Sequence, residues 1–284
     1  MYPFRSAFPR ARHGSGGRLA RRRAPRIADC PRASPQSLEL MNDPAWTLTG
    51  EAPARSLGLQ GFVRLEAAQL LSLGGLQLAD VERWRPSWDR LPPDAWLRDG
   101  GRYRSRRHGC FVHEVATARV EQAPHRAHWQ PVDYNALHGG IERMFEPIEP
   151  QLCADPAWAR LLRKLGELFE TVAPAGRWFI EAHQFRIDTT DGVGRPTPEG
   201  AHRDGVDFVV VILVERHAVR GGETRVFEAD SPRGIRFVMD EPWSAVLLDD
   251  LKVIHETTPI QPDGADPRRD TLVLTYRRAG FLSP

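Results

Sequence analysis

The chain has 284 residues, of which 41% are hydrophobic and 27% charged, with a net charge of +2. These proportions are ordinary for a soluble globular protein, and the length fits one domain with additions. The longest uninterrupted apolar run, residues 208–214, is far shorter than the roughly 20 residues that span a membrane. The three cysteines, Cys30, Cys110 and Cys153, fit no disulfide or zinc pattern. The sequence therefore predicts a cytoplasmic protein without a transmembrane segment.

Positive charge is concentrated in residues 1–40. This segment contains nine Arg against two acidic residues, a balance of +7, so the rest of the chain carries about −5. It is also rich in Pro, Gly and Ser and lacks a periodic apolar pattern, so we expect it to be disordered. It could be an organellar transit peptide, or its Arg21–Arg22–Arg23 cluster could contact nucleic acid or acidic lipid. The interpretation we favour is an over-extended start, with translation beginning at Met41.

Residues 41–284 are expected to form a single domain, and its first part, residues 41–175, mixes helix and strand signals. Strands are predicted at 61–65 and 102–115, and helices at 67–76 and 155–172. The last is the best helix of the chain, because Asp155 can cap it and Pro156 suits its first position. Four of its residues form an apolar stripe that should pack against a sheet: Leu161, Leu162, Leu165 and Leu168.

Two histidines in the predicted strand at 102–115, His108 and His113, belong to no metal-ligand spacing. We interpret both as ordinary surface or hydrogen-bonded histidines, because other residues supply a full ligand set.

Residues 176–284 have the pattern of a β-rich core that could bind a metal. Predicted strands lie at 178–187, 206–214, 223–228, 235–240, 243–248 and 269–278, separated by turns rich in Gly, Pro and Asp. Many short strands with close turns and no helices between them indicate a sandwich or barrel. The expected fold class is therefore mainly β with flanking helices.

Three side chains in this core could bind a transition metal. His202 and Asp204 form a His-x-Asp pair, which a strand would present on one face, and His255 follows 53 residues after His202. Two imidazoles and one carboxylate on one side of a metal leave positions open, an arrangement that suits non-haem Fe(II). A single His-x-Asp pair is close to chance, so the hypothesis depends on the downstream histidine at a strand end.

A second pair suggests an anion site. Arg269 and Thr271 are two residues apart on the last predicted strand and would lie on one face, where a guanidinium and a hydroxyl can hold a carboxylate. Arg268 should point to the opposite face.

This order of motifs resembles the Fe(II)/2-oxoglutarate-dependent dioxygenase family. Within it, the strings EAHQFRI (181–187), HRDGVDFV (202–209), GGETRVF (221–227) and RRDTLVLTYRR (268–278) are similar to the bacterial free L-amino-acid hydroxylases typified by isoleucine 4-hydroxylase. The resemblance implies a double-stranded β-helix of the jelly-roll, cupin-like type, with Fe(II) on His202, Asp204 and His255. It also implies 2-oxoglutarate held by Arg269 and Thr271, and O2 consumed with release of succinate and CO2 while an aliphatic C–H is hydroxylated.

The substrate is less well indicated. Gln184 and Arg186 share a strand face and could enter the cavity, where Arg186 would bind a substrate carboxylate or simply pair with an acidic neighbour; His183 is expected to be structural. Three hypotheses remain open. The first is hydroxylation of a small free amino acid. The second is the same chemistry on a protein or peptide residue. The third is a β-barrel without catalytic activity that serves as a binding module, with nucleic acid as one candidate partner. The sequence does not indicate an oligomeric state.

Overall fold

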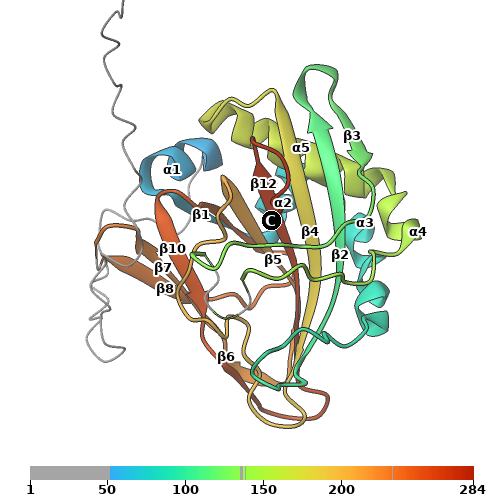
Figure 1. Ribbon diagram of the computed structural model, residues 1–284, viewed down its shortest axis with the longest axis vertical. Helices are drawn as coiled ribbons and strands as arrows, with labels where there is room; N and C mark the ends of the chain where they lie inside the picture. The colour runs from blue at the N-terminus through green and yellow to red at the C-terminus, as the bar shows by residue number, and fades with distance from the viewer. Residues whose placement is uncertain (1–51, 135–136, 138, 232) are drawn as a thin grey trace, which may run out of the picture. The chain divides into compact units, whose positions relative to one another are not determined.

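A seven-stranded antiparallel sheet with the strand order β1-β9-β5-β12-β4-β2-β3 forms the centre of the fold (Figure 1). The computed structural model describes residues 52–134, 137, 139–231 and 233–284, so the predictions for residues 1–40 and for Met41 lie outside the described residues. The strands are β1 (Phe62–Leu65), β2 (Arg104–Glu114), β3 (Arg119–Gln122), β4 (Arg177–Asp188), β5 (Phe208–His217), β6 (Val219–Gly221), β7 (Glu223–Glu228), β8 (Gly234–Val238), β9 (Ala245–Asp249), β10 (Val253–Thr257), β11 (Ile260–Pro262) and β12 (Arg268–Arg277). The helices are α1 (Pro53–Gln60), α2 (Ala67–Gly74), α3 (Leu78–Glu82), α4 (Pro150–Cys153) and α5 (Pro156–Val172), with 3-10 turns η2 (Arg85–Arg90) and η3 (Val115–Thr117).

A smaller sheet with the order β10-β7-β8 packs against the large one, and β11 pairs with β6. An apolar core joins the two sheets, since Val209 and Leu213 of β5 cluster with Val226 of β7 and Val253 of β10. Two antiparallel sheets packed face to face make a jelly roll. The expected mainly β double-stranded β-helix with flanking helices is confirmed.

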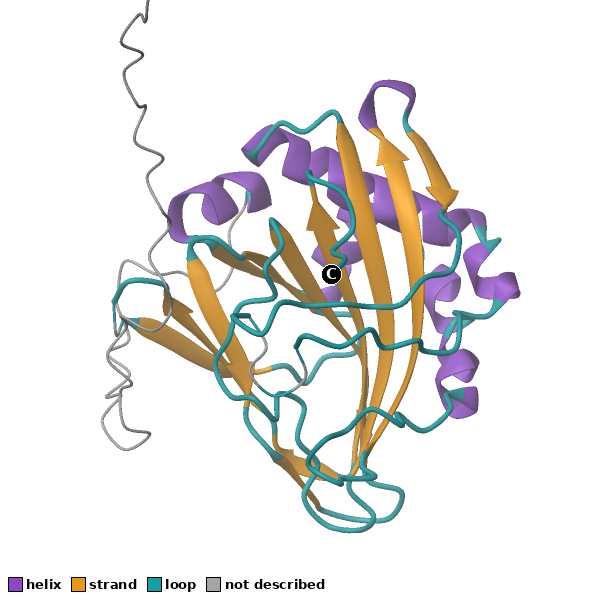
Figure 2. Cartoon of the chain, viewed as in Figure 1, coloured by secondary structure: helices purple, strands orange, loops and turns teal. Residues whose placement is uncertain are grey.

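Helix α5 covers the other face of the large sheet (Figure 2). The side chain of Asp155 accepts a hydrogen bond from the N–H of Ala157, as expected of a helix cap, and the predicted leucine stripe is buried. The hydroxyl of Tyr276 on β12 donates to the carbonyl of Leu162 at 2.9 Å, which fixes the helix on the sheet.

The alternation of residues along β4 divides its side chains between two environments. Trp178, Ile180 and Ala182 join the core under α5. The residues between them face the jelly-roll interior and line a cavity: Phe179, Glu181, His183, Phe185 and Ile187. The strand therefore separates a packing face from a functional face.

Several elements differ from the predictions. The short helices α1, α3 and α4 and the strands β3, β6, β10 and β11 had no periodic pattern long enough to predict them. Both His108 and His113 are fully buried, so the surface alternative is wrong for each. Neither ring nitrogen of His113 has a hydrogen-bond partner among the described residues, so the hydrogen-bonded alternative is wrong for His113 as well. Cys110 and Cys153 are free thiols. Among the described residues, no helix is both long and apolar enough to cross a membrane.

Candidate active site

The structure brings His202, Asp204 and His255 together at the edge of the interior cavity. His255 lies on β10, and its backbone exchanges two hydrogen bonds of 3.0 Å with His202 in an isolated antiparallel bridge. The strand expected at His202 and Asp204 is absent, because β5 begins only at Phe208. The bridge to β10 therefore positions His202, and the loop that follows positions Asp204.

One ligand atom from each of the three side chains lies within 4.8 Å of the other two. The Nε2 atoms of His202 and His255 are each 3.8 Å from an oxygen of Asp204. A single cation with bonds of about 2.1 Å can bridge such separations. Nδ1 of His202 donates to the carbonyl of Gly200 at 2.9 Å, which leaves the Nε2 lone pair for the metal.

A second carboxylate fixes the loop that carries Asp204. Asp250 accepts hydrogen bonds from the backbone N–H groups of Asp204, Gly205 and Val206, at 2.8 to 3.1 Å. The side chain of Asp204 also accepts from Nε2 of Gln130 at 3.2 Å. These contacts hold the carboxylate toward the two imidazoles before any metal is bound.

The electrostatics of these three groups fit a bound dication. Burial raises the pKa of Asp204, although His202 opposes this effect. Burial also lowers the pKa of His255 well below its usual value, so this ring is neutral and has a free lone pair. Nδ1 of His255 is buried and has no hydrogen-bond partner among the described residues. A metal would stabilise the buried carboxylate, and the donor set of two imidazoles and one carboxylate suits Fe(II).

Arg269 and Thr271 of β12 line the same cavity. Both are about 3% exposed, and no described residue accepts a hydrogen bond from Nε or Nη2 of Arg269. Burial lowers the pKa of Arg269 to about 10, and Arg216 adds to this. A buried guanidinium without an acceptor is unfavourable unless an anionic ligand pairs with it. Arg268 points away, as expected, and its Nε donates to Glu215 at 2.9 Å.

The structure does not bring Gln184 and Arg186 into the cavity. Nε2 of Gln184 donates to the Ser87 hydroxyl at 2.7 Å, and Arg186 forms a bidentate ion pair with Asp270 at 2.6 and 2.8 Å. Both lie on the face of β4 opposite to the cavity-lining residues, so the expectation that they enter the cavity is wrong. His183, expected to be structural, lines the cavity instead. The apolar residues of β4 lie on both faces, so no alternation of polar and apolar residues identifies the face that points into the cavity.

The sequence interpretation missed a group of polar residues on the cavity wall. Arg104 and Arg106 come from β2, Glu181 from β4, and the others from an irregular segment between β3 and α4. That segment contributes His128, Gln130 and Arg143. Arg104 and Arg106 are two residues apart on a strand and share a face, which is a signal that could have been used. The segment without regular structure offered no such signal.

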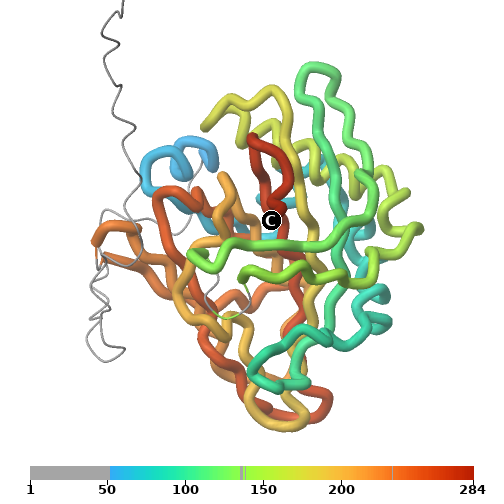
Figure 3. Tube along the Cα trace, viewed as in Figure 1, coloured from blue at the N-terminus to red at the C-terminus, as the bar shows by residue number. Residues whose placement is uncertain are grey.

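The C-terminal segment, whose end is marked in Figure 3, contributes residues to the lining of the cavity. Phe281 and Leu282 line the cavity. The rings of Phe281 and Phe179 pack edge to face, with their centres 5.2 Å apart. Nη2 of Arg126 donates to the carbonyl of Leu282 at 3.1 Å, and its guanidinium lies 4.9 Å from the Phe281 ring centre. The end of the chain thus adds apolar surface beside the charged groups.

Comparisons with known proteins indicate the family of the chain. Residues 85–275 match the 2OG-Fe dioxygenase family. A solved structure of a bsmA homolog from Methylobium petroleophilum PM1 is 54% identical, covers 82% of this chain and 94% of its own, and superposes with a TM-score of 0.79. No curated protein matches the chain.

Two further solved structures share the fold at low identity. IDO from Bacillus thuringiensis is 18% identical, with 79% of this chain and 96% of its own covered and a TM-score of 0.65. The Fe(II)/(alpha)ketoglutarate-dependent dioxygenase TqaL is 20% identical, with 79% and 85% covered and a TM-score of 0.60. The matched residues and the 54% identical relative lead to one conclusion: the chain belongs to the 2OG-Fe dioxygenase family and is an oxygenase that uses Fe(II), 2-oxoglutarate and O2.

Proposed function

We propose that this oxygenase hydroxylates an aliphatic C–H of a free L-amino acid. In this proposal His202, Asp204 and His255 hold Fe(II), and Arg269 and Thr271 hold the distal carboxylate of 2-oxoglutarate. The observation that carries the proposal is the pairing of two features in one cavity: three metal-ligating side chains, and a buried guanidinium without an acceptor among the described residues.

Bound iron and 2-oxoglutarate supply the oxidising chemistry, with succinate and CO2 as by-products. The chain's own residues orient the reactants. Arg269 and Thr271 share one face of β12, so a guanidinium and a hydroxyl can grip one carboxylate from the same side. Fixing that carboxylate directs the other end of 2-oxoglutarate toward the metal ligands.

The apolar part of the cavity supports a small aliphatic substrate. Val206, Val211 and Val273 line the cavity, as do Phe179 and Phe281, which form an aromatic pair. Such surfaces can enclose a hydrocarbon chain and exclude water from its reacting carbon. A free amino acid carries such a chain together with two charges, and the cavity offers charged partners for them.

The first test measures succinate formation from 2-oxoglutarate by protein loaded anaerobically with Fe(II) and then exposed to air. A pool of the common L-amino acids should stimulate turnover. His202→Ala and Arg269→Ala should abolish it, whereas Arg268→Ala should keep it because Arg268 pairs with Glu215 outside the cavity. Iron-dependent turnover that no amino acid stimulates would refute the substrate proposal and leave the enzyme class intact.

A further inference from the structure

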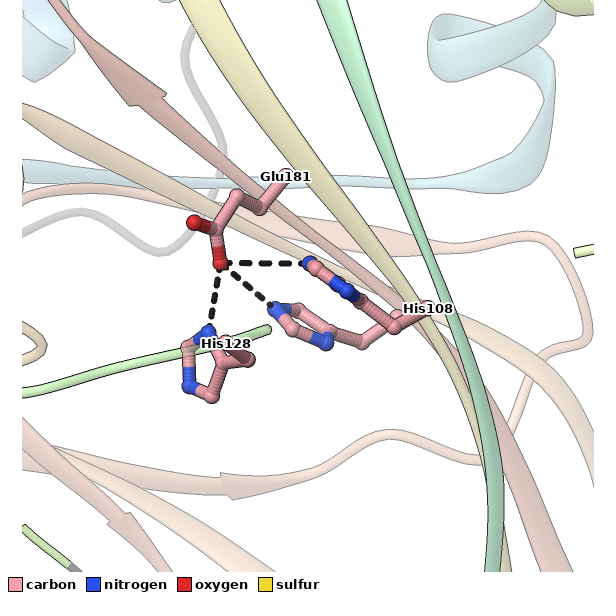
Figure 4. Close-up of side chains that lie close together, drawn as sticks. His108, His128 and Glu181 are labelled. Carbon is pink, nitrogen blue, oxygen red and sulfur yellow. Dashed lines mark hydrogen bonds and ion pairs between the residues drawn. The ribbon is translucent and has the colours of Figure 1, made fainter. Parts of the chain in front are cut away.

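A cluster of three histidines and one glutamate lies on the cavity wall apart from the proposed metal ligands. His108, His128, Glu181 and His183 are all buried, and their ligand atoms lie within 4.8 Å of one another. Oε2 of Glu181 accepts a hydrogen bond of 2.5 Å from Nδ1 of His128 and lies 3.3 Å from Nε2 of His108 (Figure 4). Nε2 of His183 is 3.6 Å from the same oxygen. All three rings therefore face a single oxygen atom.

Glu181 is held as a carboxylate. Burial alone would raise its pKa, but the electrostatic interaction with the His128 ring and hydrogen bonds from the three rings outweigh burial and keep the pKa well below its usual range. Burial lowers the pKa of His128 to about 4, so the ring is neutral and its N–H donates. The second oxygen, Oε1, has no hydrogen-bond partner among the described residues, although Glu181 lines the cavity. A carboxylate on the cavity wall with one oxygen free of protein hydrogen bonds can accept a hydrogen bond from a cationic group of a ligand.

A metal ion is a poor partner for this cluster. Nη2 of Arg106 lies 2.6 Å from Nδ1 of His183. A guanidinium can only donate, so Nδ1 is the acceptor and the proton of the neutral ring is on Nε2, which faces Glu181. Metal binding at that Nε2 would require loss of this proton.

The arginines beside the cluster supply an excess of positive charge. Arg104, Arg106 and Arg143 are buried and line the cavity. Asp94 pairs with Arg104 at 2.7 Å and approaches Arg106 at 4.0 Å. One nitrogen of each arginine is buried without a partner among the described residues: Nη2 of Arg104, Nε of Arg106 and Nε of Arg143. This side of the cavity is therefore suited to an anion.

Arg143 has a direct structural link to both the cluster and the metal ligands. It pairs with His128 in an isolated antiparallel bridge, so the two residues lie opposite each other. Its Nη2 donates to Oε1 of Gln130 at 2.9 Å, and Nε2 of Gln130 donates to Asp204. Burial lowers the pKa of Arg143 to about 10, and Arg104 adds to this. A carboxylate bound at Arg143 would compensate for the burial of this guanidinium. Only the side chain of Gln130 lies between Arg143 and the proposed metal ligand Asp204 in this chain of hydrogen bonds.

We propose that Glu181 and Arg143 form the subsite that recognises the α-ammonium and α-carboxylate groups of a free amino acid. Oε1 of Glu181 accepts from the ammonium, and the guanidinium of Arg143 binds the carboxylate. This inference rests on the proposed function and adds the residues that select the substrate class. A free amino acid neutralises both buried charges at once, whereas a residue inside a peptide has neither group, so the subsite favours a free substrate.

The experiment measures binding to protein loaded with Mn(II) and 2-oxoglutarate under anaerobic conditions. Isothermal titration with each of the twenty proteinogenic L-amino acids identifies the tightest. That amino acid is then compared with its α-carboxamide and with the carboxylic acid of the same skeleton lacking the amine. The wild-type protein should bind both analogues at least tenfold more weakly than the amino acid.

Two variants should each remove one part of this discrimination. Glu181→Gln should bind the amino acid at least tenfold more weakly and no longer prefer it to the acid without the amine. Arg143→Met should no longer prefer it to the carboxamide. Glu121→Gln and Arg119→Met, which change an exposed ion pair on β3, are the matched controls and should keep both preferences.

Three results would overturn the proposal. One is that the preferences survive in both variants while the proteins remain folded by circular dichroism. Another is that no proteinogenic amino acid binds; Arg269-dependent succinate formation then shows whether the proposed co-substrate site still stands. The last is a second Mn(II) or Zn(II) ion per chain that is lost in His108→Gln, which would make the cluster a metal site. Unchanged affinity for 2-oxoglutarate in Glu181→Gln separates the subsite from the co-substrate site.

Discussion

The backbones of His202 and His255 hydrogen-bond to each other in both directions, although the two residues are 53 positions apart. This places their ring centres 4.7 Å apart and brings one proposed metal ligand from the β4–β5 connection next to one from β10. Asp204 has no such bridge, and its backbone depends on Asp250. The geometry of the candidate metal site therefore has one rigid part and one part that a single carboxylate supports.

Asp250→Asn should weaken metal binding without removing a ligand. Asp250 accepts three backbone hydrogen bonds, whereas an amide has only one oxygen to accept them, so the Asp204 loop should loosen. We expect at least a tenfold loss in Mn(II) affinity, the range typical of residues that position metal ligands. Equilibrium titration of the metal-free protein measures it. The control is Asp240→Asn, whose side chain is largely exposed; an equal loss there would contradict the role of Asp250.

Thr271→Val should raise the KM for 2-oxoglutarate. The change keeps the shape of the side chain but removes the hydroxyl proposed to donate to the distal carboxylate. A hydrogen bond to a charged group contributes about 1.5–3 kcal/mol, which corresponds to roughly a 10- to 150-fold change. Steady-state succinate formation at varied 2-oxoglutarate measures the effect. Thr275→Val, on the same face of β12 four residues further along, should change KM much less, and similar effects in both variants would argue against a specific contact with Thr271.

Site residues could be predicted from the sequence only where a strand or a turn determines the direction in which a side chain points. Arg269 and Thr271 face the cavity while Arg268 does not, as alternation on β12 predicts. On β4 the same rule could not identify the residues that face the cavity, because both faces of the strand are buried and neither is marked by exposed polar residues. Gln184, for example, is as buried as the apolar Ala182.

The remaining site residues depend on tertiary contacts that local patterns do not encode. His128 and Arg143 meet through one isolated bridge between irregular segments. The residues between them show no helical or strand periodicity in the sequence, so the proximity of His128 and Arg143 is evident only in the folded chain. The same is true of His202, whose bridge to His255 replaces the expected strand.

Phe281→Ala should weaken binding of the amino-acid substrate more than binding of 2-oxoglutarate. Phe281 packs edge to face on Phe179 and beside Arg126 at the cavity, and its removal opens apolar surface to water. Loss of an aromatic pair costs about 0.5–1.5 kcal/mol beyond the lost area, so a several-fold rise in KM for the amino acid is expected. Solvent entry should also increase succinate formed per product formed, measured by mass spectrometry of both. The control is Leu251→Ala, which truncates a side chain that is 61% exposed; the same uncoupling there would rule out a specific role for Phe281.

Acid should destabilise the protein through its buried histidines. Burial lowers the pKa of His108, His128 and His183, and for His128 the value is about 4. In the unfolded chain each imidazole takes up a proton near pH 6.5, whereas in the folded protein each stays neutral. The unfolded state therefore binds more protons below pH 6.5, and the free energy of unfolding falls as the pH drops from about 6.5 toward 4. Each ring contributes about 1.4 kcal/mol per pH unit while only the unfolded state is protonated.

Urea unfolding of the metal-free protein at pH 7.0, 6.0 and 5.0 measures this slope. His128→Gln removes one of the titrating rings. The slope of its free energy of unfolding against pH should therefore be smaller, by the amount that corresponds to about one bound proton. His217→Gln changes an exposed histidine at the end of β5 and should keep the wild-type slope. A slope that is the same in all three proteins would mean that His128 titrates alike in the folded and unfolded states.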